Sequence, residues 1–261
     1  MLLLHALVTR WVCDEPQPGW VQIELTDADG HVRRFEEKSA VIDADGQLHV
    51  GAQYPVDVQI ACLPRYQTLG KKGLVNVVDL SPWGIGDENA VYPVERGQLS
   101  WGPPALYSDL SVCARQAVAL VTFRRWRRAV GLRSSELVKL EDHLWEYATV
   151  TSDTFDTWYR SQCPLVDGDE LPQNLKELAV VRGLSPDDVR DALGALVDIT
   201  YGGLFGRIAS EDSLGMLETF GRLTAQYGVP LVPAADFTGS LWIDDDWGRP
   251  DQALVNLWQD M

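Results

Sequence analysis

The chain has 261 residues, of which 46% are hydrophobic and 23% are charged, a composition typical of a globular protein with room for two modest domains. Its formal net charge is −16, and a surface of that sign repels nucleic acid and anionic membranes. No apolar run approaches the ~20 residues that a membrane-spanning helix needs. We therefore expect no nucleic-acid or membrane partner. The simplest interpretation of the charge is that it keeps the protein dispersed in solution, and as an alternative it would favour a protein partner with a basic surface.

Four cysteines are spread along the chain, namely Cys13, Cys62, Cys113 and Cys163. Their spacing includes no CxxC pair, which excludes a zinc knuckle or a thioredoxin-like motif. The apolar start MLLLHALVTRW is short, and it lacks the basic segment and the small-residue cleavage site of a signal peptide. We expect reduced thiols, a cytoplasmic location, and neither a cofactor nor a metal site.

The first part of the chain is predicted to consist of short strands joined by turns. Asp29-Gly30 and Asp45-Gly46 are hairpin signals, because both central residues of a type I′ turn need positive φ. Strands are expected at 2–12, 20–27, 31–38, 40–42, 48–50, 56–60, 74–78 and 90–94. Six to eight strands without a helical stretch predict an antiparallel β barrel or sandwich.

The segment 97–104, GQLSWGPP, is predicted to separate two domains. It holds two glycines and two adjacent prolines, and the hydrophobic period changes after it. We therefore predict a β-rich domain at 1–103 and a helical domain at 104–261, which together make an α+β fold.

Capping residues mark the starts of about six predicted helices. Asp109 is expected to cap a long helix that ends at Gly131, where the left-handed conformation suits glycine. Either Ser134 or Ser135 is expected to cap the next helix. Ser185 is followed by proline and two acids, which is typical of a helix start. Further helices are expected to begin at Ser152 or Asp153, near 172, at 210 and near 253.

The segment 137–158, LVKLEDHLWEYATVTSDTFDTW, combines acidic and aromatic residues in a predicted helical stretch. Carboxylates attract a basic partner, and large aromatic side chains supply contact area in protein interfaces. This composition is typical of a recognition surface. We predict that its partner-binding residues are Glu141, Asp142, Glu146, Asp153 and Asp156.

His143 and Glu146 lie three residues apart in that segment, so that they share one side of a helix. A histidine beside carboxylates can serve as a general base or as a metal ligand. A metal site needs three or more convergent ligands, whereas this stretch has one histidine and no HExxH pattern. A structural role for His143 is the first interpretation, and catalysis by His143 and Glu146 is the alternative.

A second acidic cluster, LWIDDDWGRP, lies near the C-terminus. Its spacing does not match an EF-hand, and contiguous acids cannot all converge on one cation. A solvated loop is the simplest interpretation of such a charge run. As a functional alternative, we predict that Asp244, Asp245, Asp246 and Trp247 bind the same basic partner.

Two further patterns receive structural interpretations. The basic run 124–128, RRWRR, is predicted to form ion pairs within this acidic chain rather than to bind phosphate. The glycine-rich run 201–206, YGGLFG, matches neither GxGxxG nor a P-loop, and it is predicted to end a helix.

Two parts of the chain resemble a group of uncharacterised bacterial proteins that are associated with polymorphic-toxin immunity genes. The first part comprises VTRWVCDEPQPGWVQIELTDADGHVRRFEEK, YPVDVQIACLP and DLSPWGI, and the second is ALVDITYGGLFGRIASEDSLGMLETFGRLTAQYGVPL. The similarity covers a third to a half of the chain and includes no active-site motif. It implies an intracellular protein that neutralises a partner by binding it.

The leading hypothesis is therefore an immunity protein that is not an enzyme and that places acidic and aromatic side chains in the basic cleft of a toxin. The first alternative is a hydrolase or metal-dependent enzyme that uses His143 and the neighbouring carboxylates. The second alternative is a structural or scaffolding module. The sequence does not predict the oligomeric state.

Overall fold

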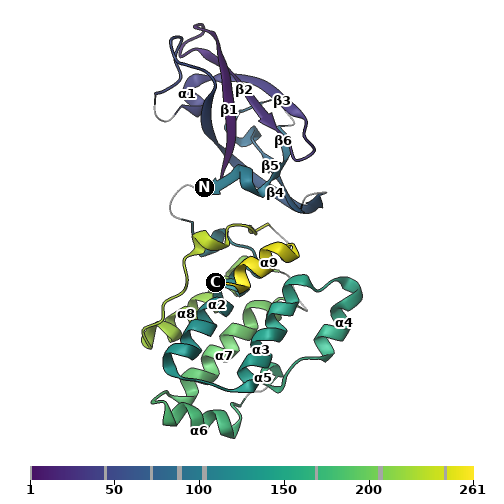
Figure 1. Ribbon diagram of the computed structural model, residues 1–261, viewed down its shortest axis with the longest axis vertical. Helices are drawn as coiled ribbons and strands as arrows, with labels where there is room; N and C mark the ends of the chain where they lie inside the picture. Colours follow the sequence, from purple (N-terminus) through teal and green to yellow (C-terminus); the bar gives the residue numbers. More distant parts are fainter. Residues whose placement is uncertain are drawn as a thin grey trace. The chain divides into compact units, whose positions relative to one another are not determined.

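The computed structural model describes residues 2–43, 46–70, 73–86, 90–101, 105–167, 170–204, 208–243 and 246–261. The chain divides into two compact units, Met1–Ala105 and Leu106–Met261. The first unit holds the strands and the second holds the long helices, which confirms the α+β fold class (Figure 1). Within the described ranges, no helix is both long enough and apolar enough to cross a membrane.

The first unit is an antiparallel sheet. In the sheet the order is β3-β2-β1-β4-β5-β6, and β7 pairs with the first residues of β1. The long strand β4 pairs with β1 through its first half and with β5 through its second half. The strands are β1 (Leu2–Cys13), β2 (Trp20–Thr26), β3 (Val32–Lys38), β4 (Val56–Gly70), β5 (Gly73–Asp79), β6 (Val91–Glu95) and β7 (Leu99–Trp101).

This sheet curls into a half-barrel, because contacts join its two ends. The N–H of Ala28, which follows β2, donates to the carbonyl of Pro93 in β6 at 2.8 Å. Phe35 of β3 stacks on Tyr92 of β6 with ring centroids 6.2 Å apart. Burial alternates along β1 and β2, where the core residues are Leu2, Leu4, Ala6, Val8, Val21, Ile23 and Leu25.

Two predictions for this unit are wrong. Residues 40–42 lie in the short helix α1 (Ser39–Ile42), and 48–50 belong to no strand. The carboxylate of Asp43 accepts the N–H groups of Gln47 and Leu48, each at 2.8 Å. These two N–H groups therefore donate to a side chain and not to the backbone of a neighbouring strand. Asp45 lies outside the described residues. The expected boundary segment 97–104 also contains a strand, since Leu99–Trp101 is β7.

The second unit is built around α2, in which every residue from Val112 to Phe123 is buried. This helix contacts α3, α7, α8 and α9. Because neighbours surround this part of the helix, its polar side chains, among them Arg115 and Gln116, are buried together with the apolar ones. The helices are α2 (Val112–Val130), α3 (Ser135–Glu146), α4 (Ser152–Arg160), α5 (Pro164–Asp167), α6 (Gln173–Val181), α7 (Pro186–Tyr201), α8 (Ser210–Gln226) and α9 (Gln252–Gln259).

Most predicted helix ends agree with the structure. Gly131 ends α2 with φ of 74°, and the hydroxyls of Ser134 and Ser185 cap α3 and α7. The prediction that Asp109 caps α2 is wrong. Ser111 is the cap and accepts the N–H of Ala114 at 3.1 Å. The Asp109 carboxylate instead accepts the N–H of Leu106 at 2.9 Å, within the preceding 3₁₀ turn.

Candidate functional site

The acidic and aromatic segment 137–158 is not one helix but three elements. It comprises most of α3, the 3₁₀ turn η4 (Tyr147–Thr149) and the first residues of α4. Thr151 is the N-cap of α4, one residue before the predicted choices, and its side chain and that of Thr154 form a capping box. The residues between the helices are mostly β-branched, which lowers their helix propensity.

Four of the predicted partner-binding residues form an exposed acidic surface on α3 and α4. Asp142 and Glu146 lie one turn apart on α3, and Asp153 and Asp156 lie one turn apart on α4. All four are exposed, and none forms an ion pair with a basic side chain in the described parts of the chain. We call these four residues the α3–α4 carboxylates.

Two exposed basic residues, Lys139 and Arg160, lie on the same two helices. Neither forms an ion pair with the α3–α4 carboxylates in the structure. Each exposed pairing of this kind contributes at most about 1 kcal/mol, because water screens the charges and long side chains lose freedom. The surface therefore keeps its negative charge available to another molecule.

Glu141 does not belong to this surface, which corrects its predicted role. It is 5% exposed, and its carboxylate accepts the Nε–H of Arg124 at 2.7 Å and a second hydrogen bond from Arg127. These pairs join α2 to α3. For Arg124 and Arg127, they confirm the prediction that the basic run 124–128 forms ion pairs within the chain.

His143 is held inside an aromatic cluster. It is 5% exposed and stacks on Trp158 with ring centroids 4.8 Å apart and an interplanar angle of 2°. Its Nε2 lies 2.7 Å from the hydroxyl of Tyr201, and its carbonyl accepts the indole N–H of Trp158 at 2.9 Å. Burial lowers the pKa of His143 below its ordinary value. The imidazole is therefore neutral at pH 7 and packs between helices.

The alternative pair of catalytic residues, His143 and Glu146, is not assembled. Glu146 is exposed on the outer side of α3, whereas His143 faces Tyr201 and Trp158. A general base must lie within hydrogen-bond reach of the proton that it removes from the substrate, whereas the Nε2 of His143 lies against the hydroxyl of Tyr201. The position of His143 instead supports the structural interpretation.

The C-terminal acidic cluster is described only in part, because Asp244 and Asp245 lie outside the described residues. The carboxylate of Asp246 accepts the N–H of Gly248 at 2.8 Å. Trp247 is half-buried, and its ring meets the edge of Tyr147 at a centroid distance of 5.2 Å. Trp247 thus packs within the chain, so only part of its ring is available to a partner.

Arg249, which the sequence reasoning did not select, attaches this cluster to the α3–α4 segment. Its guanidinium donates to the carbonyls of Tyr147 and Val150 and lies 4.7 Å from the ring centroid of Tyr147. The loop that carries Asp246 therefore lies against η4, between the two helices that carry the α3–α4 carboxylates. In the sequence, the one feature that could have indicated this role is a single arginine within the acidic, tryptophan-containing stretch LWIDDDWGRP.

A second cluster of ligand-type atoms lies in the turn between β2 and β3. One ligand atom each of Asp27, Asp29 and His31 lies within 4.8 Å of the others. The buried carboxylate of Asp27 accepts the N–H groups of Asp29 and His31 and the Nε–H of Arg33 at 3.0 Å or less. Burial alone would raise the pKa of Asp27, but these hydrogen bonds lower it. This carboxylate stabilises the hairpin.

Comparison with protein-family models, with curated proteins and with solved structures finds no match to this chain.

Proposed function

We propose that this protein is a binding protein of the immunity type, which is not an enzyme and which neutralises a toxin by occupying its basic cleft. The observation that carries the proposal is the group of α3–α4 carboxylates, which are exposed and form no ion pairs with the described basic side chains. The resemblance of two stretches to proteins associated with toxin immunity supports a toxin as the partner.

The electrostatics of the chain favour such a partner. With a net charge of −16, the protein attracts a basic surface over several ångströms beyond contact. Complementary charge mainly increases the association rate and the specificity, whereas buried aromatic contacts supply most of the affinity. Phe155 and Tyr159 of α4 are half-buried and stack on each other at 5.9 Å, so that both can contribute such contacts.

The proposal is tested with the product of an adjacent gene as the candidate toxin. We expect a stable 1:1 complex by size-exclusion chromatography with light scattering. The double variant Asp142→Lys with Asp153→Lys should lower the association rate by about tenfold, and added salt should lower the wild-type rate.

The matched control is Glu218→Lys with Asp236→Lys, which makes the same charge change at two exposed carboxylates away from α3 and α4. If both double variants slow association equally, the effect belongs to net charge and the α3–α4 surface is not the interface. If no complex forms with a basic toxin, the proposed function is wrong.

A further inference from the structure

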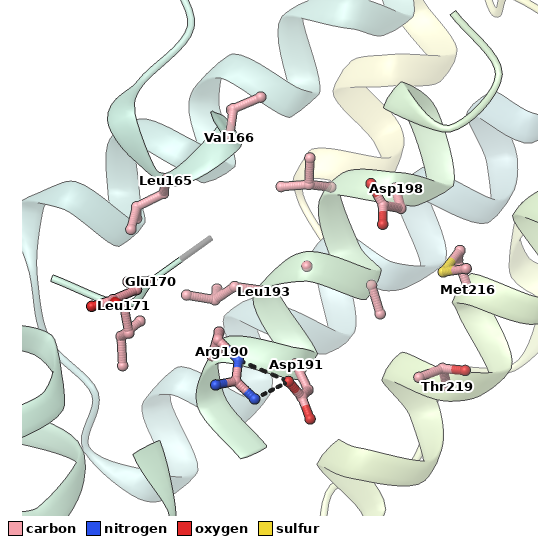
Figure 2. Close-up of a pocket in the computed structure, with 13 residues that line it drawn as sticks. Leu165, Val166, Glu170, Leu171, Arg190, Asp191, Leu193, Asp198, Met216 and Thr219 are labelled. Carbon is pink, nitrogen blue, oxygen red and sulfur yellow. Dashed lines mark hydrogen bonds and ion pairs between the residues drawn. The ribbon is translucent and has the colours of Figure 1, made fainter. Parts of the chain in front are cut away.

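A groove with an apolar floor runs along α7 in the second unit. It has a volume of about 430 Å³. Leu165 and Val166 of α5 line one side, and Met216 and Thr219 of α8 line the other (Figure 2). Leu193 of α7 contributes to the lining and is buried. A space of this size accommodates one or two side chains of another molecule.

A glycine in the middle of α7, Gly194, lines the groove. Asp191, Gly194 and Asp198 are spaced three and four residues apart and therefore lie along one side of the helix. Among the described residues, no atom beyond the helix lies within 4 Å of the position that a Cβ on Gly194 would occupy. Glycine is a poor helix former, and packing within the chain does not require it here. The missing Cβ leaves open space beside the helix at this point, which a side chain of another molecule can enter.

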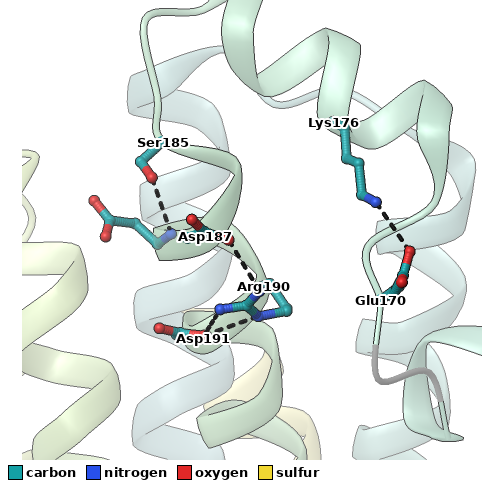
Figure 3. Close-up of polar contacts among 7 residues, drawn as sticks. Glu170, Lys176, Ser185, Asp187, Arg190 and Asp191 are labelled. Atoms are coloured by element: carbon teal, nitrogen blue, oxygen red, sulfur yellow. Dashed lines mark hydrogen bonds and ion pairs between the residues drawn. The ribbon is translucent and has the colours of Figure 1, made fainter.

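The charges along the groove are paired at one end and unpaired at the other. Arg190 donates to Asp187 and Asp191, each at 2.9 Å, and Lys176 lies 3.2 Å from Glu170 (Figure 3). No described side chain forms an ion pair or hydrogen bond with the carboxylate of Asp198, which Figure 2 shows at the opposite end from Arg190. The groove therefore joins an apolar floor to one free negative charge.

We propose that this groove binds an arginine side chain of the protein partner, with the guanidinium at Asp198 and the aliphatic stem over Gly194. An apolar neighbour of that arginine would contact Leu165 and Met216. The inference deepens the proposed function, on which it rests, by naming a second contact surface and the residue type that it selects.

Charge and hydration decide between the possible occupants. A free anion is repelled by Asp198, and a second copy of this chain carries the same net charge of −16. Guanidinium is more weakly hydrated than ammonium and packs flat on apolar side chains, so arginine suits a partly apolar groove better than lysine does.

The test uses the full chain labelled with ¹⁵N-glycine, in which the cross-peak of Gly194 is assigned from its loss in Gly194→Ala. The probe is the peptide acetyl-Leu-Arg-Leu-amide, and its citrulline counterpart is the uncharged control. We expect a saturable shift of the Gly194 cross-peak with a Kd on the order of 1 mM, while most other glycine cross-peaks stay in place. Asp198→Asn should raise that Kd about threefold to fivefold, whereas Glu218→Gln should leave it unchanged.

The inference is overturned by a Gly194 cross-peak that does not move, by an equal shift with the citrulline peptide, or by an unchanged Kd in Asp198→Asn. A shift of Gly194 with protein concentration alone would show that a second copy occupies the groove and would also overturn it. None of these results bears on whether the toxin complex forms, so the proposed function stands or fails by its own experiment.

Discussion

Two buried basic side chains in the helical unit differ in how their charge is accommodated. Arg115 is fully buried and donates to the carbonyls of Tyr107, Ser108 and Ser210 and to the hydroxyls of two serines. Burial lowers the pKa of Arg115 to about 10, so that it stays charged at pH 7. His143 has one hydroxyl partner and two aromatic neighbours, and it is neutral. Arg115 keeps its charge because the ordinary pKa of arginine is high, and its hydrogen bonds offset part of the cost of burying that charge.

The buried His143 predicts a loss of stability in mild acid. Its pKa is lowered in the folded state, so as pH falls through the ordinary value of 6.5 the unfolded chain binds the proton first. The stabilisation is therefore complete above pH 6.5 and declines below it, by up to about 1.4 kcal/mol per pH unit. Urea unfolding across this range should show the decline, and His143→Gln should reduce it. If the variant loses stability with falling pH as the wild type does, the loss does not come from His143.

Helix pairs in the second unit are joined by specific polar contacts as well as by apolar packing. Glu141 joins α3 to two arginines of α2, and the side chains of these arginines are 22% and 12% exposed. Trp158 joins α4 to α3 through the carbonyl of His143. These contacts orient the outer sides of α3 and α4, and thus the α3–α4 carboxylates.

Glu141→Gln should destabilise the protein by about 2–3 kcal/mol, because it leaves two partly buried guanidinium groups without their counterion. The neighbouring Asp142→Asn is the matched control and should change the free energy of unfolding by less than about 0.5 kcal/mol, since Asp142 is exposed. Urea denaturation measures both. Equal effects would mean that the Glu141 ion pairs contribute nothing beyond surface charge.

Gly194 and Gly215 occupy interior positions of α7 and α8, and a Cβ at either would meet no described atom beyond its own helix. Replacing either glycine by alanine should raise the thermal midpoint by about 2–4 °C, because alanine is the better helix former. Only Gly194→Ala should weaken the toxin complex, because only Gly194 lines the groove. Equal affinities of the two variants would show that the glycine has no role in binding.

Over the whole molecule, the charge of −16 produces self-repulsion that opposes the compact state. Raising sodium chloride from about 20 mM to about 300 mM shortens the Debye length severalfold and should raise the thermal midpoint by a few degrees. Potassium chloride should have the same effect, since screening depends on ionic strength. A midpoint that falls with salt would show that ion pairs outweigh the repulsion.

Local chemistry in the sequence determined much of the fold. The apolar run at 2–12 predicted β1, and the Asp29-Gly30 turn signal between two short segments predicted β2 and β3. The residues around Gly131, Ser134 and Ser185 predicted where helices end and begin. These signals act over a few residues, through backbone conformation and capping hydrogen bonds. The net charge likewise follows from composition alone.

Tertiary structure decided what depends on residues far apart in the chain. Strand β7 forms because Leu99–Trp101 pairs with β1, about 95 positions earlier in the chain. The predicted hairpin at 40–50 does not form, because the carboxylate of Asp43 accepts the N–H groups of Gln47 and Leu48. Glu141 and Asp142 are adjacent acids in the sequence, yet one is buried against arginines and the other is exposed. Helix packing decides which acids are buried and which are exposed, and for this reason the group of α3–α4 carboxylates is defined only by the folded chain.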